Sequence, residues 1–213
     1  MGRFQRSVPT LVIALLLAAC STGSSSGSAE SGPSTTAAGG EVASWSRPAD
    51  PMSLAEEAGL TPDVKEYFDY HVHAHLDVFV DGEPVEIPGG IGIETTDPAV
   101  QSFPPTGFGG IPETGCEQAC ISPLHTHDVD GVIHIEAPSD AEFTLGQFFE
   151  QLAVRLDATC VDDYCMPDTP VAVYVDGEPR SGDPADIVLA DGQEIAIVIG
   201  TPPDEIPDSF VGS

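Results

Sequence analysis

Alternating apolar and polar side chains predict a β-strand over residues 71–80. Neighbouring side chains of a strand point to opposite faces of the sheet. Val72, Ala74 and Leu76 therefore share one face of this strand. We expect that face to pack against a core and the opposite, more polar face to stay free for other contacts.

Two Asp-Gly pairs, at 81–82 and 176–177, are typical of tight hairpin turns. The first follows the strand at 71–80, so residues 84–87 are expected to return beside it. The second would close a strand at 171–175. Further apolar runs predict strands at residues 131–137 and 194–199.

One amphipathic helix is expected to begin near Thr144. Thr144 and Gln147 have the spacing of a capping box, in which each side chain bonds the backbone of the other. The apolar residues that follow fall on one helical face. They are Leu145, Phe148, Phe149, Leu152 and Leu156.

Two shorter helices are expected earlier in the chain. Ser53 and Glu56 also have capping-box spacing, which predicts a helix starting at Ser53. A second would start at Thr61, with Pro62 at its first helical position.

These elements predict a single α+β domain over residues 51–203, followed by a tail at 204–213. We expect a mixed β-sheet with one main packed helix. The order of elements in the second half resembles a β-grasp, or ubiquitin-like, unit.

The chain is expected to begin with an export signal. Arg3 and Arg6 precede an uncharged apolar run at residues 11–19, which suits a signal peptide better than a membrane span. The run ends at Leu17-Ala18-Ala19-Cys20, which resembles the lipobox of bacterial lipoproteins. That resemblance implies cleavage after residue 19 and lipid attached to Cys20. The protein would be anchored in the cell membrane, on its extracytoplasmic side.

Residues 21–50 are rich in Ser, Gly, Ala and Thr, which predicts a flexible linker. The charge balance is strongly acidic, with 35 acids, six Lys and Arg and a net charge of −29. Removing residues 1–20 would take away two of the basic residues and no acid. Such a chain repels nucleic acid and favours cations, so no nucleic-acid partner is expected.

Four cysteines remain beyond Cys20, which fits two disulfides in an exported domain. Three pairings are possible, and the close spacings favour Cys116–Cys120 and Cys160–Cys165. The first pair lies in a long segment rich in Gly and Pro, at residues 88–123, which we expect to be irregular. Metal-binding thiolates are the alternative, although no spacing is the C-x-x-C of zinc sites.

All six histidines of the chain lie in a few short segments. Imidazole is the commonest transition-metal ligand. The outer two histidines of the first strand would be roughly 13 Å apart, so one ion must draw a ligand from another segment. One ion or two ions could be held. The candidate ligands are His71, His73, His75, His125, His127 and His134.

Asp77, Asp128 and Glu136 are candidates to orient the imidazoles through hydrogen bonds. A site rich in imidazole and poor in thiolate suits copper or zinc. The sequence does not choose between these metals.

The segments HVHAHL, at residues 71–76, and LHTHDVDGVIHIEAP, at residues 124–138, together with FTLGQFFEQ, resemble an uncharacterised family of exported prokaryotic proteins. The resemblance spans roughly residues 70–200. It implies a shared domain and brings no activity with it.

The sequence therefore predicts a membrane-tethered protein that binds, buffers or delivers copper or zinc outside the cytoplasm. We expect a binding protein rather than an enzyme. Two alternatives remain open: an oxidoreductase or hydrolase that uses the same ion, and a cell-surface interaction module that binds no metal. No protein partner is indicated.

Overall fold

A computed structural model of the chain describes residues 45–210. Cys20, the expected signal peptide and the linker up to residue 44 lie outside the described residues. Within them, no helix has the length and apolar character needed to cross a membrane.

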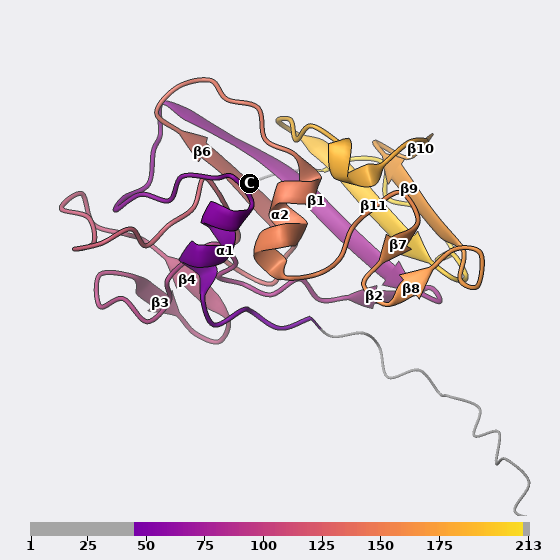
Figure 1. Ribbon diagram of the computed structural model, residues 1–213, viewed down its shortest axis with the longest axis horizontal. Helices are drawn as coiled ribbons and strands as arrows, with labels where there is room; N and C mark the ends of the chain where they lie inside the picture. Colours follow the sequence, from indigo (N-terminus) through magenta and orange to yellow (C-terminus); the bar gives the residue numbers. More distant parts are fainter. Residues whose placement is uncertain (1–44, 211–213) are drawn as a thin grey trace, which may run out of the picture. The chain divides into compact units, whose positions relative to one another are not determined.

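A seven-stranded mixed sheet forms the centre of the described domain, in the order β10-β9-β11-β1-β6-β5, with β2 also paired to β1 (Figure 1). Its strands are β1 Tyr70–Val80, β2 Glu83–Val85, β5 Leu124–His125, β6 Val132–Ala137, β9 Val171–Val175, β10 Glu178–Arg180 and β11 Gln193–Ile199. Two small hairpins lie outside it: β3 Gln101–Phe103 with β4 Gly107–Gly109, and β7 Cys160–Val161 with β8 Tyr164–Cys165. The helices are α1 Pro51–Glu57, α2 Leu145–Leu152 and a 3-10 turn, η1 Pro184–Asp186.

The long strand β1 organises this sheet. One of its edges pairs antiparallel with β6 and then with β2, while its other edge pairs in parallel with β11. A parallel pair requires a crossover connection, and α2 lies between β6 and β9 along the chain. A central parallel pair of first and last strands resembles the β-grasp arrangement. The unit therefore includes β1, from the first half of the chain. The α+β class, the mixed sheet and the packed helix are confirmed.

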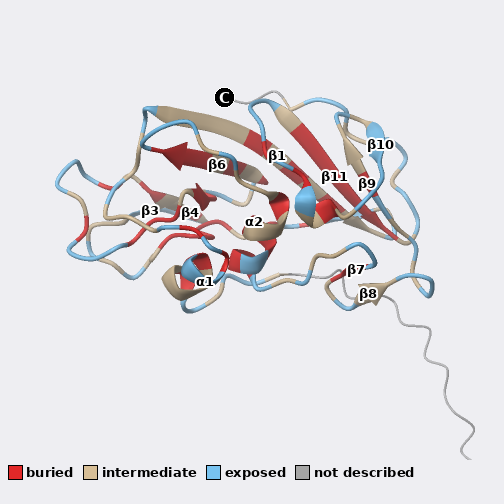
Figure 2. Cartoon of the chain, turned by 45° about the horizontal axis from the view of Figure 1, so that its top comes forward, coloured by how far each residue is buried: buried red, intermediate tan, exposed pale blue. Residues whose placement is uncertain are grey.

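Both α-helices lie on one side of the sheet, and the buried residues concentrate between these layers (Figure 2). Thr144 accepts from the Gln147 backbone, and Gln147 bonds back to the Thr144 backbone, which confirms the capping box. Phe148 and Phe149 are buried in the same core as Ala74 and Leu76, which lie on the apolar face of β1. Ala153 adopts a left-handed conformation and ends the helix, so Leu156 lies beyond it.

Of the two earlier helices that the sequence predicted, one is present but begins before Ser53, and the other is absent from the described residues. The helix α1 starts at Pro51, and Asp50 accepts the Ser53 N–H, so Ser53 is inside the helix rather than its cap. No helix starts at Thr61, because the backbone of Asp63 instead pairs with Ile121. Tertiary pairing outweighs local helix propensity here.

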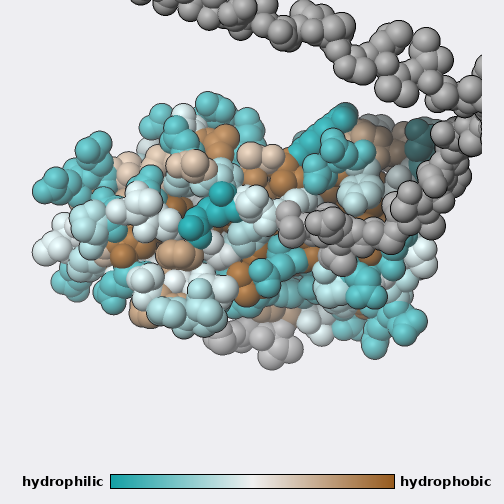
Figure 3. All heavy atoms as spheres, turned by 90° about the horizontal axis from the view of Figure 1, so that it is seen from below, coloured by the Kyte–Doolittle hydropathy of each residue, from teal (hydrophilic) through white to brown (hydrophobic). Residues whose placement is uncertain are grey.

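Both favoured disulfides are present, Cys116–Cys120 and Cys160–Cys165. The first closes a short loop within the long segment at residues 88–123, which also carries the small β3–β4 hairpin. Cys116 and Cys120 pack with Ile93 and Ile121 in a second, smaller core. On the face drawn in Figure 3, hydrophilic residues surround separate hydrophobic patches, as the acidic composition leads one to expect.

Candidate metal centre

Strand pairing brings four histidines and a glutamate to the face of the sheet opposite α2. His73 of β1 lies opposite His134 of β6, and His134 lies opposite His125 of β5. This makes a row of three imidazoles across three strands. His71 lies opposite Glu136 in the next pair. His127 follows β5 and joins the group, with its ring centre 4.3 Å from that of His134.

On the β1 side of this cluster, three ring nitrogens face one another. His134 Nδ1 lies 3.1 Å from His73 Nε2 and 3.4 Å from His71 Nε2. These separations suit donors around one ion, because ligands at about 2 Å from a metal lie no more than about 4 Å apart.

On the β5 side, backbone carbonyls fix the tautomers of two imidazoles. His125 Nδ1 lies 2.9 Å from Ser122 O, and His127 Nδ1 lies 2.7 Å from Phe108 O. A carbonyl only accepts, so each Nδ1 carries the hydrogen and each Nε2 keeps its lone pair. This support is characteristic of metal-bound histidines. His125 is fully buried, and its Nε2 has no hydrogen-bond partner among the described residues.

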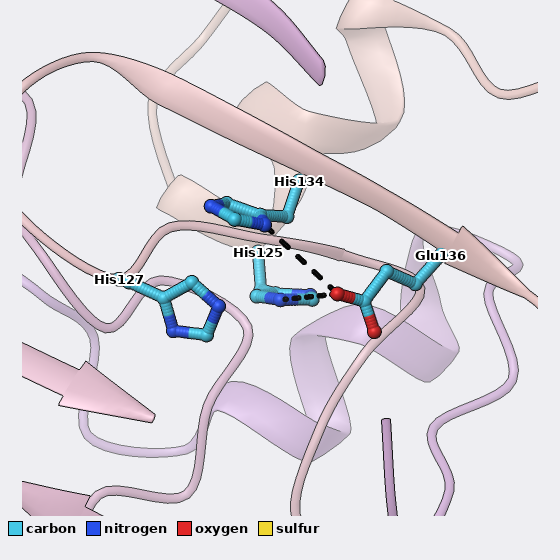
Figure 4. Close-up of side chains that lie close together, drawn as sticks. All are labelled: His125, His127, His134 and Glu136. Atoms are coloured by element: carbon cyan, nitrogen blue, oxygen red, sulfur yellow. Dashed lines mark ion pairs between the residues drawn. The ribbon is translucent and has the colours of Figure 1, made fainter. Parts of the chain in front are cut away.

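Glu136 directs one carboxylate oxygen into the cluster (Figure 4). Its Oε1 lies 3.3 Å from His71 Nε2, 3.7 Å from His125 Nε2 and 3.9 Å from His134 Nδ1. The other oxygen, Oε2, accepts the backbone N–H of Tyr67 at 3.1 Å. The carboxylate is thus held in place while Oε1 remains available.

Burial and crowding lower the pKa values of four of these imidazoles. Burial, with the neighbouring imidazoles, lowers the pKa of His134 to about 3 and holds that of His125 well below its usual range. The pKa values of His71 and His73 are also lowered, chiefly by burial. Burial and the nearby Glu66 raise the pKa of Glu136 to about 7. The result is a set of unprotonated nitrogens that face one another.

Glu66 is a site residue that the sequence did not suggest. Its Oε1 lies 4.0 Å from His127 Nε2, and burial raises its pKa. It stands in the segment expected to be helical after Thr61. No sequence pattern marks it, because its position depends on the pairing of Asp63 with Ile121.

Three other candidates lie away from the cluster. His75 donates through Nε2 to Asp130 O at 2.8 Å, and its Nδ1 lies 2.9 Å from Glu194 Oε2. Asp77 is near this pair, 3.7 Å from His75 Nδ1. The bond with Glu194 raises the pKa of His75 to about 9. Asp128 accepts from Thr106 and from the Val129 backbone and, among the described residues, bonds no imidazole.

The clustered side chains could hold a metal ion. In each of two groups that share His134, the donor atoms lie within 4.8 Å of one another. His75, Asp77 and Glu194 form a third group of this kind. The four cysteines of the described domain are in disulfides, so the donors at the main cluster are imidazoles and carboxylates. The two groups that share His134 are, first, His125, His127, His134 and Glu136 and, second, His71, His73 and His134.

No protein-family model, curated protein or solved structure matches the chain.

Proposed function

We propose that this protein binds a transition metal ion, copper or zinc, at the cluster of five histidines and Glu136. The observation that carries the proposal is the fully buried Nε2 of His125. It has no hydrogen-bond partner among the described residues and lies beside Glu136 Oε1. An unpaired buried polar atom costs about 1–3 kcal/mol, and a metal ion would satisfy it.

Copper and zinc fit the donor set best. Imidazole suits both ions, whereas sites that select Cu(I) are rich in thiolate or thioether. The cysteines of the described domain form disulfides, which removes them as ligands. The single carboxylate among the donors is compatible with either divalent ion.

We further propose that the protein is held at the extracytoplasmic face of the cell membrane by lipid on Cys20. The lipobox-like segment before Cys20 and the two disulfides support this location, since disulfides persist in oxidising compartments. There the protein would buffer the metal or pass it to another carrier.

A metalloenzyme is the second candidate, and one cavity favours it. A cavity of about 310 Å³ adjoins the cluster, and Glu136, Glu66, Tyr67 and Phe143 are among the residues that line it. A substrate bound there would lie against Glu136. With a pKa near 7, that carboxylate could act as a general base.

Metal analysis of the purified protein tests the main proposal. We expect the dialysed wild-type protein to retain copper or zinc. His134→Ala removes the donor shared by both groups, so it should weaken binding by more than about 100-fold, beyond the loss of a merely supporting hydrogen bond. Titration with Cu²⁺ or Zn²⁺, with far-UV circular dichroism to check folding, measures this effect.

His75→Ala is the matched control. It removes a histidine from the same face of β1 but outside the cluster, so affinity for the first ion should stay within a few-fold of wild type. A folded wild-type protein that binds neither metal would overturn the proposal. Equal losses in the two variants would instead place His75 among the ligands.

A further inference from the structure

The donors of the cluster divide into two halves. The strand triad consists of His71, His73 and His134, whose ring nitrogens lie 3.1 and 3.4 Å apart around His134 Nδ1. The loop triad, named for His127 in the loop after β5, consists of His125, His127 and Glu136, which fall in one group of potential ligands with His134. Six donors are therefore available, counting each side chain once.

One ion does not use all of these donors. Zinc in proteins is almost always four-coordinate when its site is structural. An ion held by the strand triad and Glu136 leaves the buried Nε2 of His125 without a partner. An ion held by the loop triad and His134 does not use His71 and His73, so their Nε2 atoms bind no metal.

Glu136 belongs to the loop triad and also reaches the strand triad. Its Oε1 lies 3.3 Å from His71 Nε2 in the strand triad and 3.7 Å from His125 Nε2 in the loop triad. Its Oε2 is held by the Tyr67 N–H, which leaves Oε1 as the oxygen that both ions can share. Carboxylate oxygens commonly bind divalent ions, and two-ion sites place the ions about 3.5–4 Å apart.

The charge around the cluster also suits two ions. Two divalent cations close together repel each other, and negative side chains nearby reduce that cost. Glu136 Oε1 is near both triads, and Glu66 Oε1 lies 4.0 Å from His127 Nε2 in the loop triad. The chain as a whole carries a net charge of −29.

We propose that the centre holds two metal ions, one in the strand triad and one in the loop triad, bridged by Oε1 of Glu136. This inference rests on the proposed function, because it concerns the same cluster. It adds a second ion and gives Glu136 the role of linking the two.

Stoichiometry tests the inference directly. The metal-depleted full-length protein is titrated with Cu²⁺, and bound ions are counted by native mass spectrometry and elemental analysis. We expect two ions in the wild type and also in His75→Ala, which disables the third group of potential ligands. His71→Ala/His73→Ala should keep one ion in the loop triad, and His127→Ala should keep one in the strand triad. Each variant should therefore bind one ion, but through a different set of ligands.

Magnetic coupling tests the bridge. Two Cu²⁺ ions joined through one oxygen lose much of their electron paramagnetic resonance intensity, because their unpaired spins couple. We expect the copper-loaded wild-type protein to give a resonance intensity well below that of two isolated Cu²⁺ ions. Glu136→Gln should regain signal per bound copper, while Glu150→Gln, an exposed change on α2, should not.

The outcomes separate this inference from the proposed function. Binding that saturates at one ion in the folded wild type overturns the two-ion centre and leaves metal binding standing. No bound ion overturns both. Two ions with full, uncoupled signal in wild type would overturn the role of Glu136 as the bridge.

Discussion

At the scale of single residues, Gly109 determines how the His127 ring is held. A Cβ atom at this position would lie directly against His127 Nδ1, and φ there is +141°, which L side chains rarely adopt. The same ring nitrogen donates to the neighbouring Phe108 O. Only glycine at 109 leaves room for the hydrogen bond that fixes the hydrogen on His127 Nδ1. That hydrogen bond keeps the lone pair on Nε2.

Gly109→Ala should therefore weaken metal binding without removing a ligand. We expect a loss of about 10–100-fold in affinity, the usual effect of disturbing a group that orients a metal-bound histidine. Titration with Cu²⁺ measures it. Gly182→Ala is the control, since Gly182 also has a positive φ but no atom within 4 Å of the added Cβ. Equal effects of the two changes would contradict the role assigned to Gly109.

At the scale of the elements, β1, β5 and β6 place neutral imidazoles in one row. Where burial lowers a pKa, the folded protein resists protonation that the unfolded chain accepts. His134 has a pKa of about 3 in the folded protein against its usual 6.5. Its contribution to stability is thus present above pH 6.5 and is lost as the pH falls toward 3. The pKa of Glu136 is instead raised from 4.5 to about 7, so its contribution to stability grows as the pH falls from 7 to 4.5.

The metal-free protein should therefore lose stability on acidification, and His134 should account for part of the loss. We expect the unfolding temperature of wild type to fall more steeply than that of His134→Asn between pH 6.5 and 3. Chelator-treated samples in a series of buffers, followed by circular dichroism, give both curves. Parallel curves would mean that burial at His134 does not perturb its titration.

The elements that the sequence predicted are those with a local signal. Alternation at β1 and the capping box at Thr144 depend on neighbours in the chain, and both were confirmed. The helix expected at Thr61 failed because the long-range pairing of Asp63 with Ile121 uses that backbone. Likewise the histidine ligands could be proposed from type and spacing. That His75 lies outside the cluster could be known only from the strand register. That Glu66 lies near His127 could be known only from the path of a loop.

At the scale of the whole molecule, the lipid proposed on Cys20 would hold the domain near a membrane. Two acyl chains give stable anchoring, because each buried CH₂ contributes about 0.8 kcal/mol. Cys20→Ser should move the protein from the membrane fraction to the soluble fraction. Fractionation of cells with immunoblotting measures this, with Ser21→Ala as the control. A Cys20→Ser protein that still sediments with membranes and resists high salt would contradict lipid anchoring.

The parallel pairing of β1 with β11 also sets an order of assembly. β1 is the first strand of the sheet and β11 the last, and Ala74 pairs with Gln193 across more than half of the chain. Contacts so distant in sequence form slowly, since a long loop must close first. Until β11 arrives, one edge of the histidine-bearing strand is open to pairing with other chains. A chain that is released N-terminus first would therefore complete the sheet beside its clustered histidines only after nearly all of the chain has emerged.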